Sequence, residues 1–254
     1  MVDVKAFADG KPKTRRIYLE DSYIKKLETS VIAGICERGR KCYVILKETI
    51  FHPQGGGQPS DAGEITGENF KLSVKKVLDV NDVLIHYGIL EQGELMHAGE
   101  RVELSIDWNR RYSIMKAHTA GHILDYAVNA VMRKYVETIS ASHSPEGAYV
   151  VYKIENDDLL DLEKVELVAN EAARACRAVR VVYISREELF SKLNNVPNLE
   201  RLPVLSSYRI ISIDGINSIP CSGTHVMNTC EINEIEVLGK EKVQGGIALH
   251  YKVV

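Results

Sequence analysis

Apolar positions in residues 14–108 follow the spacing of short β-strands. Two apolar runs, at residues 30–36 and 42–47, flank a polar segment with a glycine, which is typical of a hairpin. A second pair of runs, at residues 71–78 and 83–88, flanks another short polar turn. Many short strands at close spacing predict a small β-barrel.

Two further patterns at the ends of this region predict one more strand and one helix. Val102, Leu104 and Ile106 alternate with polar residues, as in a strand with one buried face. Residues 17–27 are expected to form a short helix before the first strand.

Near residue 107 the apolar spacing changes to a period of about 3.6, which is typical of a helix packed on one side. Residues 107–135 are predicted to form the longest helix, capped by Asp107 or Asn109. The remaining elements are expected as strands at residues 147–154, 181–184, 208–213, 231–238 and 247–253, and as helices at residues 158–179 and 186–193. Because β and α units do not alternate regularly, this half is predicted to be α+β.

The 254 residues are therefore expected to form two domains: a β-barrel domain over residues 1–108 and an α+β domain over residues 109–254. No apolar run approaches the ~20 residues needed to span a bilayer, so no membrane partner is expected. The first ten residues lack the apolar segment of a secretory signal, which favours a cytoplasmic protein. The sequence assigns no oligomeric state.

Five cysteines are scattered along the chain without a paired framework. In the absence of an export signal they are expected to be reduced thiols. Cys36, Cys42, Cys176 and Cys230 are interpreted as small buried hydrophobic residues. A bond between Cys36 and Cys42 across the first hairpin is the less favoured alternative.

The formal net charge of −3 indicates no basic surface for nucleic acid. A protein that holds only one end of an RNA needs no more than a local basic patch. Candidate patches are Arg15 with Arg16, Arg38 with Arg40 and Lys41, Arg110 and Arg111 with Lys116, and Arg174 with Arg177 and Arg180. Taken singly, each cluster is more simply explained as part of a solvent-exposed surface than as an RNA-binding patch.

Two short motifs place metal-binding side chains four residues apart. One contains His118 and His122, within the longest predicted helix, and the other contains Cys221 and His225. On a helix, residues at this spacing share one face. Either pair alone is more often two ordinary buried side chains than a metal site. Together, three imidazoles and one thiolate predict one zinc ion per chain.

Glycines mark two places where the chain requires space. Residues 55–57 are three consecutive glycines bounded by Pro53 and Pro59, which indicates a shaped loop next to Gln58 rather than a strand or helix. Gly121 lies inside the longest predicted helix, where it costs ~1 kcal/mol relative to alanine. Its position beside the paired histidines indicates that room is needed there.

Three motifs in this order resemble the editing domain of alanyl-tRNA synthetase and the AlaX-type editing proteins. They are FHPQGGGQ with a following DAG at residues 51–63, HTAGH at residues 118–122, and CSGTHV at residues 221–226. The resemblance covers the chain from about residue 14 onward. It implies a small β-barrel followed by a zinc-binding α+β domain. With no sign of an aminoacylation domain, the free-standing form is expected.

The resemblance also implies a reaction and a partner. The reaction is hydrolysis of the ester in seryl-tRNA(Ala), and in some members glycyl-tRNA(Ala), so the expected partner is tRNA(Ala) carrying serine or glycine. The residues that fall on the family's zinc ligands are His118, His122, Cys221 and His225. The family's Gly-Gly-Gln loop falls on Gly56, Gly57 and Gln58, of which Gly57 and Gln58 are expected at the catalytic centre. In the family, a threonine downstream of the two histidines is associated with recognising the serine hydroxyl. Thr138 falls on that position when a one-residue gap is allowed.

The proposed chemistry has a physical reason. A synthetase pocket for alanine rejects one added hydroxyl only by roughly 10², so a second site must destroy the seryl ester. Zinc would either activate a water or position and polarise the ester. Four protein ligands favour positioning, because a catalytic zinc usually keeps one position open. Gln58 or backbone N–H groups would then orient the water, and no general base is assigned.

Two other functions fit parts of this pattern. A zinc peptidase needs a glutamate after the first histidine, where this chain has Thr119. A zinc-stabilised module that binds tRNA or other RNA without catalysis is the main alternative. Of the other histidines, His52 is expected to contact substrate beside the glycine loop. The remaining histidines, His86, His97, His143 and His250, are interpreted as ordinary core or surface residues.

Overall fold

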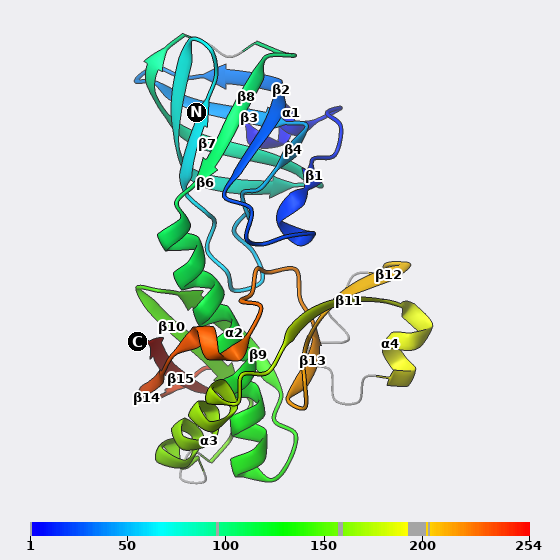
Figure 1. Ribbon diagram of the computed structural model, residues 1–254, viewed down its shortest axis with the longest axis vertical. Helices are drawn as coiled ribbons and strands as arrows, with labels where there is room; N and C mark the ends of the chain where they lie inside the picture. Colours follow the sequence, from blue (N-terminus) through cyan, green and yellow to red (C-terminus); the bar gives the residue numbers. More distant parts are fainter. Residues whose placement is uncertain (1, 95–96, 157–159, 193–201, 203) are drawn as a thin grey trace. The chain divides into compact units, whose positions relative to one another are not determined.

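The computed structural model describes residues 2–94, 97–156, 160–192, 202 and 204–254. The chain folds into two compact units (Figure 1). Unit 1 comprises Met1–Gly55 and Pro59–Tyr112, and unit 2 comprises Gly56–Gln58 and Ser113–Val254. The domain limits 1–108 and 109–254 stay a prediction.

Unit 1 is a closed β-barrel with the strand order β2-β3-β7-β6-β5-β8, in which all neighbouring strands are antiparallel. Its strands are β2 (Lys26–Cys36), β3 (Lys41–Leu46), β5 (Gly63–Thr66), β6 (Phe70–Val80), β7 (Val83–Gly93) and β8 (Arg101–Ile106). The side chains of Leu46, Leu72 and Leu104 are fully buried in its core. The predicted barrel is therefore confirmed.

The helix expected at residues 17–27 is wrong. Only Ile17–Leu19 forms a short 3-10 turn, η1, and β2 already begins at Lys26. From Lys26 onward the backbone pairs with β8, and before it the Asp21 carboxylate accepts the N–H of Tyr23, which favours a turn over a helix. The other short elements of unit 1 are α1 (Val4–Ala8), β1 (Arg15–Arg16) and β4 (Glu48–Thr49).

A buried ion pair lies where the long helix α2 (Trp108–Met132) begins. The Asp107 carboxylate accepts the N–H of Arg110 and caps the helix, as predicted. Arg111 is 0% exposed, and its Nε donates to both carboxylate oxygens of Asp61 at 2.9 and 3.1 Å. Arg111 also donates to the carbonyl of Ile50 at 2.5 Å. Arg111 is therefore structural and does not belong to a basic surface patch.

Unit 2 contains two antiparallel sheets, with strand orders β14-β15-β10-β9 and β11-β12-β13. Its strands are β9 (Thr138–Ser144), β10 (Gly147–Tyr152), β11 (Val179–Ser185), β12 (Ser207–Ile213), β13 (Asn217–Pro220), β14 (Ile235–Val243) and β15 (Gly246–Val253). Besides α2, its helices are α3 (Leu162–Arg174), α4 (Arg186–Lys192) and the 3-10 turn η4 (Thr229–Ile232). The α+β prediction is confirmed.

Helix α2 packs along the first of these sheets, next to β9 and β15 (Figure 1). The hydroxyl of Tyr251 in β15 donates to the carbonyl of Ala117 at 2.8 Å. The hydroxyl of Thr138 in β9 donates to the Asp125 carboxylate at 2.9 Å. Side chains on this face of α2 therefore lie between the helix and the sheet.

Strands β9 and β13 were not predicted. The sequence of β9, Thr138–Ser144, is mostly small and polar, so it lacks the apolar alternation of a buried strand. The helix expected at residues 158–179 is observed as α3, capped by the Asp161 carboxylate. Asp158 and Leu159, at its expected start, lie outside the described residues, as does Leu193 at the expected end of α4.

The expectation of reduced thiols is wrong for four of the five cysteines. Cys36 pairs with Cys42, and Cys176 pairs with Cys230. The first disulfide joins residues that face each other across β2 and β3. The second joins Cys176, which follows α3, to Cys230 in η4. Both of these cysteines are exposed rather than buried. Cys221 is the free thiol.

Among the described residues, no helix has both the length and the apolar character that crossing a membrane requires.

Candidate metal centre

The structure brings together the four residues predicted to bind a metal. His118 and His122 come from α2, and Cys221 and His225 come from the loop that follows β13. One ligand atom from each side chain lies within 4.8 Å of all the others, and the three histidines are buried. The Cys221–His225 pair lies in a loop, so its spacing does not act through a helix.

The distances in this cluster match those around a tetrahedral ion. Cys221 Sγ lies 3.5 Å from His118 Nε2 and 3.3 Å from His225 Nε2. A tetrahedral zinc with bonds of about 2.0 Å to nitrogen and 2.3 Å to sulfur places such ligand atoms about 3.5 Å apart. The side chains are therefore already arranged as they would be around one metal ion.

Gln58 determines which nitrogen of His118 faces the cluster. Its Oε1 accepts the backbone N–H of Thr224 at 2.9 Å and lies 2.9 Å from His118 Nδ1. Because a backbone N–H can only donate, the amide oxygen faces both groups and His118 Nδ1 carries the proton. The Nε2 lone pair is left for a metal. Such outer-shell partners orient metal ligands and tune their basicity.

Thr119 does the same for His225. Its hydroxyl donates to the Met115 carbonyl at 2.8 Å, so it must accept from His225 Nδ1, which lies 3.1 Å away. Nε2 of His225 therefore also presents a lone pair to the cluster. Thr119 occupies the position of the glutamate that a zinc peptidase uses as its general base. Here its hydroxyl instead supports the candidate metal ligand His225.

Burial shifts the protonation equilibria of two side chains in the cluster. Burial lowers the pKa of His122 to about 4, and Arg209 contributes to this effect. Burial raises the pKa of the Cys221 thiol, while the Gly223 N–H and Arg209 oppose the rise. Among the described residues, the buried Nδ1 of His122 has no hydrogen-bond partner. A metal ion would favour the neutral imidazole and the thiolate, and the donor set fits it.

The loop after β13 packs too tightly against His118 for any side chain at Gly223. A Cβ there would lie 2.2 Å from His118 Cε1 and 2.7 Å from the Gln58 amide oxygen. Arg209 in β12 holds the loop by donating to the carbonyls of Cys221 at 2.7 Å and Gly223 at 3.0 Å. Glycine is therefore required for the ligand loop to reach α2.

The Gly-Gly-Gln loop has a defined shape in unit 2. Gly56 and Gly57 have positive φ angles of 58° and 78°. A Cβ on Gly57 would lie 2.8 Å from the Ala141 carbonyl, and the Gly57 carbonyl accepts the N–H of His143 at 2.8 Å. The Gln58 side chain is 1% exposed. Catalytic roles for Gly57 and Gln58 stay predictions.

A cavity of about 170 Å³ lies beside the cluster. The described residues that line it are Gly56, His118, Gly121, His122, Asp125, Thr138, Ala141, His143, Val150, Leu202, Ile219, Pro220 and Cys221. The cavity brings three of the four clustered residues together with Thr138, whose predicted role in substrate recognition stays a prediction.

His143 was expected to be an ordinary residue, but it packs against the cluster. Its ring stacks on His118 with centroids 4.2 Å apart, and its Nδ1 lies 2.8 Å from the Tyr251 hydroxyl. A Cβ on Gly121 would lie 2.5 Å from His143 Cε1, so Gly121 provides the room predicted for it. Burial lowers the pKa of His143 to about 3. The glycine inside a helix was the sequence signal for this contact.

Asp125 is the second residue that sequence reasoning missed. It lies seven residues after His118, on the same face of α2, and it lines the cavity. Burial raises the pKa of Asp125 to about 6, and the hydroxyls of Thr138 and Tyr152 oppose the rise. The Tyr152 hydroxyl is close enough for this effect, although its geometry gives no normal hydrogen bond. An acid on the buried face of the helix was the available signal.

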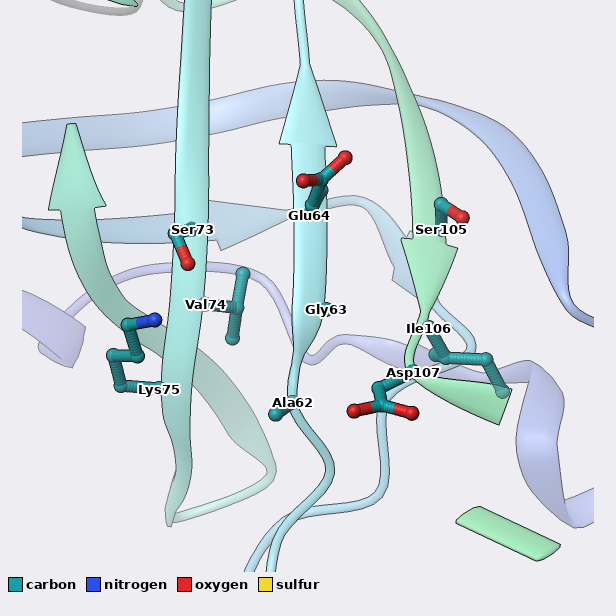
Figure 2. Close-up of a pocket in the computed structure, with 9 residues that line it drawn as sticks. All are labelled: Ala62, Gly63, Glu64, Ser73, Val74, Lys75, Ser105, Ile106 and Asp107. Carbon is teal, nitrogen blue, oxygen red and sulfur yellow. The ribbon is translucent and has the colours of Figure 1, made fainter. Parts of the chain in front are cut away.

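Unit 1 has a separate cleft of about 330 Å³, lined by β5, β6 and β8. Figure 2 shows Glu64, Ser73 and Ser105 on these three adjacent strands, with Asp107 at the end of the cleft. None of the predicted metal or catalytic residues lines it. The cluster in unit 2 is therefore the candidate site.

Comparison with known proteins identifies the family of this chain. The family model "tRNA synthetases class II (A)" matches residues 5–110, and the model "Threonyl and Alanyl tRNA synthetase second additional domain" matches residues 208–248, which include Cys221 and His225. The alanyl-tRNA editing protein AlaX-L of Pyrococcus horikoshii is 32% identical over 226 residues, which cover 88% of this chain and 54% of the relative. The chain belongs to the alanyl-tRNA synthetase editing-domain family.

Other members of the editing-domain family in the comparison are full synthetases. The alanine–tRNA ligase of Sulfurisphaera tokodaii is 32% identical over 251 residues, and that of Hyperthermus butylicus is 34% identical over 254 residues. Both alignments cover 96% of this chain and 26% of the ligase. The chain thus spans about half the length of AlaX-L and about a quarter of the ligases.

Proposed function

We propose that this chain hydrolyses the aminoacyl ester of mischarged tRNA(Ala) at a zinc-dependent site. Seryl-tRNA(Ala) is the proposed substrate, and glycyl-tRNA(Ala) is a second candidate. The observation that carries the proposal is the His₃Cys cluster next to a small cavity that Asp125 and Thr138 also line, in a chain of the editing-domain family. The names of the relatives support tRNA(Ala) as the partner.

Zinc is the metal that this donor set suits best. His118, His122, Cys221 and His225 would hold it. When bound, it supplies a positive charge that holds and polarises the ester end of the substrate. Four protein ligands support this positioning role over a zinc-bound hydroxide, because catalytic zinc sites usually keep an open position.

We infer that Gln58 acts through His118 rather than on the attacking water. Its amide oxygen is engaged by Thr224 and His118, and its Nε2 donates to the Thr224 hydroxyl at 2.9 Å. The side chain is buried, so its hydrogen bonds are directed at the protein. Gly57 supports the same arrangement by accepting the N–H of His143. In this proposal both are positioning residues.

Preference for serine over alanine would come from a hydrogen bond in the cavity. In this proposal the Thr138 oxygen accepts from the seryl hydroxyl. Loss of this hydrogen bond with an alanyl ester would cost about 1–3 kcal/mol, or about tenfold to a hundredfold.

The deciding experiment compares hydrolysis of seryl-, glycyl- and alanyl-tRNA(Ala) by the zinc-loaded chain. Rapid loss of the seryl ester with the alanyl ester spared is the expected result. Equal rates on the seryl and alanyl esters, or no hydrolysis of either, contradict the proposal. Tight tRNA binding without turnover would instead support the RNA-binding module. The buried hydroxyl at Thr119 gives no support to a peptidase.

A further inference from the structure

The cavity beside the metal cluster offers hydrogen-bond acceptors on one side. Asp125 and Thr138 lie there, and the single hydroxyl proton of Thr138 is donated to the Asp125 carboxylate at 2.9 Å. The Thr138 oxygen can therefore only accept a hydrogen bond from a ligand. An ionised carboxylate also only accepts.

His143 adds a third acceptor to this wall. The hydroxyl of Tyr251 has one proton, which it donates to the Ala117 carbonyl at 2.8 Å. It must therefore accept from Nδ1 of His143, 2.8 Å away. A neutral His143 with its proton on Nδ1 presents a bare lone pair at Nε2, and the ring lines the cavity. Gly121 leaves the space that this ring occupies.

The described lining of the cavity offers these acceptors no positive side chain. Among the described residues that line the cavity there is neither lysine nor arginine. A carboxylate in a confined site needs a cationic or hydrogen-bonding partner, because an unpaired buried charge is costly. A ligand that carries a cationic donor would complement these acceptors.

An α-amino acid ester carries such a donor at the required distance. Its protonated amine has three N–H groups, and three bonds separate the nitrogen from the carbonyl oxygen. Asp125 follows the ligand His122 by three residues on α2, which corresponds to about 4.5 Å along the helix axis. An ester held at the metal cluster therefore brings its amine toward Asp125.

We propose that the Asp125 carboxylate, with His143 Nε2 as a second acceptor, binds the α-ammonium group of the substrate. The inference rests on the deacylase function proposed above and names the feature of the substrate that this chain recognises. Asp125 is thus a specificity residue that selects esters with a free, protonated amine. Thr138 keeps the carboxylate in place by donating its hydroxyl proton to it.

Binding of stable substrate analogues tests this without relying on turnover. The probe is 3′-(L-serylamino)-3′-deoxyadenosine, in which an amide replaces the ester. It is compared by calorimetry with its N-acetyl derivative and with the 3-hydroxypropionyl analogue, which lacks the amine and is smaller. Zinc-loaded wild-type chain should bind both comparison compounds about tenfold to a hundredfold more weakly, as loss of a charged hydrogen bond implies.

Asp125→Asn should weaken binding of the seryl probe to the level of the amine-free analogue and leave binding of that analogue unchanged. The matched control is Asp161→Asn, an exposed carboxylate that caps α3 and does not line the cavity. Its affinities should equal those of wild type.

Three results would overturn the proposal. One is equal wild-type affinity for the seryl and amine-free analogues, which needs no variant and decides the matter even if Asp125→Asn fails to fold. Another is an Asp125→Asn variant that loses only its preference for the seryl probe over the corresponding alanyl compound, 3′-(L-alanylamino)-3′-deoxyadenosine, which would mean that Asp125 recognises the seryl hydroxyl. The third is an unchanged affinity of this variant for the seryl probe. Amine-selective binding without ester hydrolysis would contradict the proposed deacylase function but would still support the role of Asp125 in binding the amine.

Discussion

The amide oxygen of Gln58 lies 2.9 Å from Nδ1 of His118, and this hydrogen bond ties the glycine-rich loop to a candidate metal ligand. The same oxygen accepts the N–H of Thr224, next to the ligand His225. One buried side chain thus orients His118, one of the two candidate ligands on the helix, and contacts the loop that carries the other pair. Residues separated by 166 positions are joined at this point.

Removing this amide should weaken metal binding. Gln58→Ala is expected to lower zinc affinity by about tenfold to a hundredfold, as for other outer-shell partners. Activity lost at limiting zinc should return at saturating zinc. The control is Gln54→Ala, an exposed glutamine in the same loop. A large fall in kcat with zinc binding unchanged would show instead that Gln58 acts directly on the reaction.

Metal content should depend on the clustered histidines and on no others. We expect one zinc ion per wild-type chain and substantial loss of metal from His122→Ala. His250→Ala, a partly exposed histidine in the same unit, should keep its zinc. Elemental analysis after gel filtration checks both variants. A zinc ion retained by His122→Ala at wild-type affinity would contradict the four-ligand site.

Gly121→Ala should destabilise the protein although alanine favours helices. Helix propensity alone would add ~1 kcal/mol of stability. The new Cβ would lie 2.5 Å from His143 Cε1 and 2.9 Å from its Nδ1, so we expect a net loss of about 1–3 kcal/mol in urea unfolding. In a His143→Ala background the same change should become neutral or stabilising. Additive effects of the two substitutions would contradict this contact.

Asp125→Asn should stabilise the folded protein at neutral and higher pH. The pKa of Asp125 is about 6, above its ordinary value of 3.8. The folded state therefore holds this proton more tightly, and stability is lost as pH rises from about 4 to 6. Removing the charge should add up to about 3 kcal/mol at pH 8 and little at pH 4, because one pKa unit corresponds to 1.36 kcal/mol.

Unfolding midpoints of the two proteins in urea at pH 4, 6 and 8 check this prediction. Asp161→Asn serves as the control of opposite sign, because a hydrogen bond from Lys164 lowers the pKa of Asp161. That variant should gain no stability at pH 8. A lower stability of Asp125→Asn at pH 8 would mean that the carboxylate is satisfied within the protein and contributes to folding.

Local pattern was sufficient for much of the fold. The alternation of Val102, Leu104 and Ile106 appears as β8, and the helical spacing after residue 107 appears as α2, capped by Asp107. These predictions succeed because one buried face imposes a repeat on the residues of a single element. The helix expected at residues 17–27 failed because pairing of Lys26 and its neighbours with β8 outweighs local propensity.

The sequence by itself determined which four side chains meet, because their chemistry and spacing identify a family of metal sites. Only the tertiary structure decided what surrounds them. His143 and Asp125 belong to the site because β9 packs on α2, and Cys176 meets Cys230 because the chain returns to the end of α3. Such contacts join residues far apart in the chain, and packing between elements leaves no periodic signal along a single sequence.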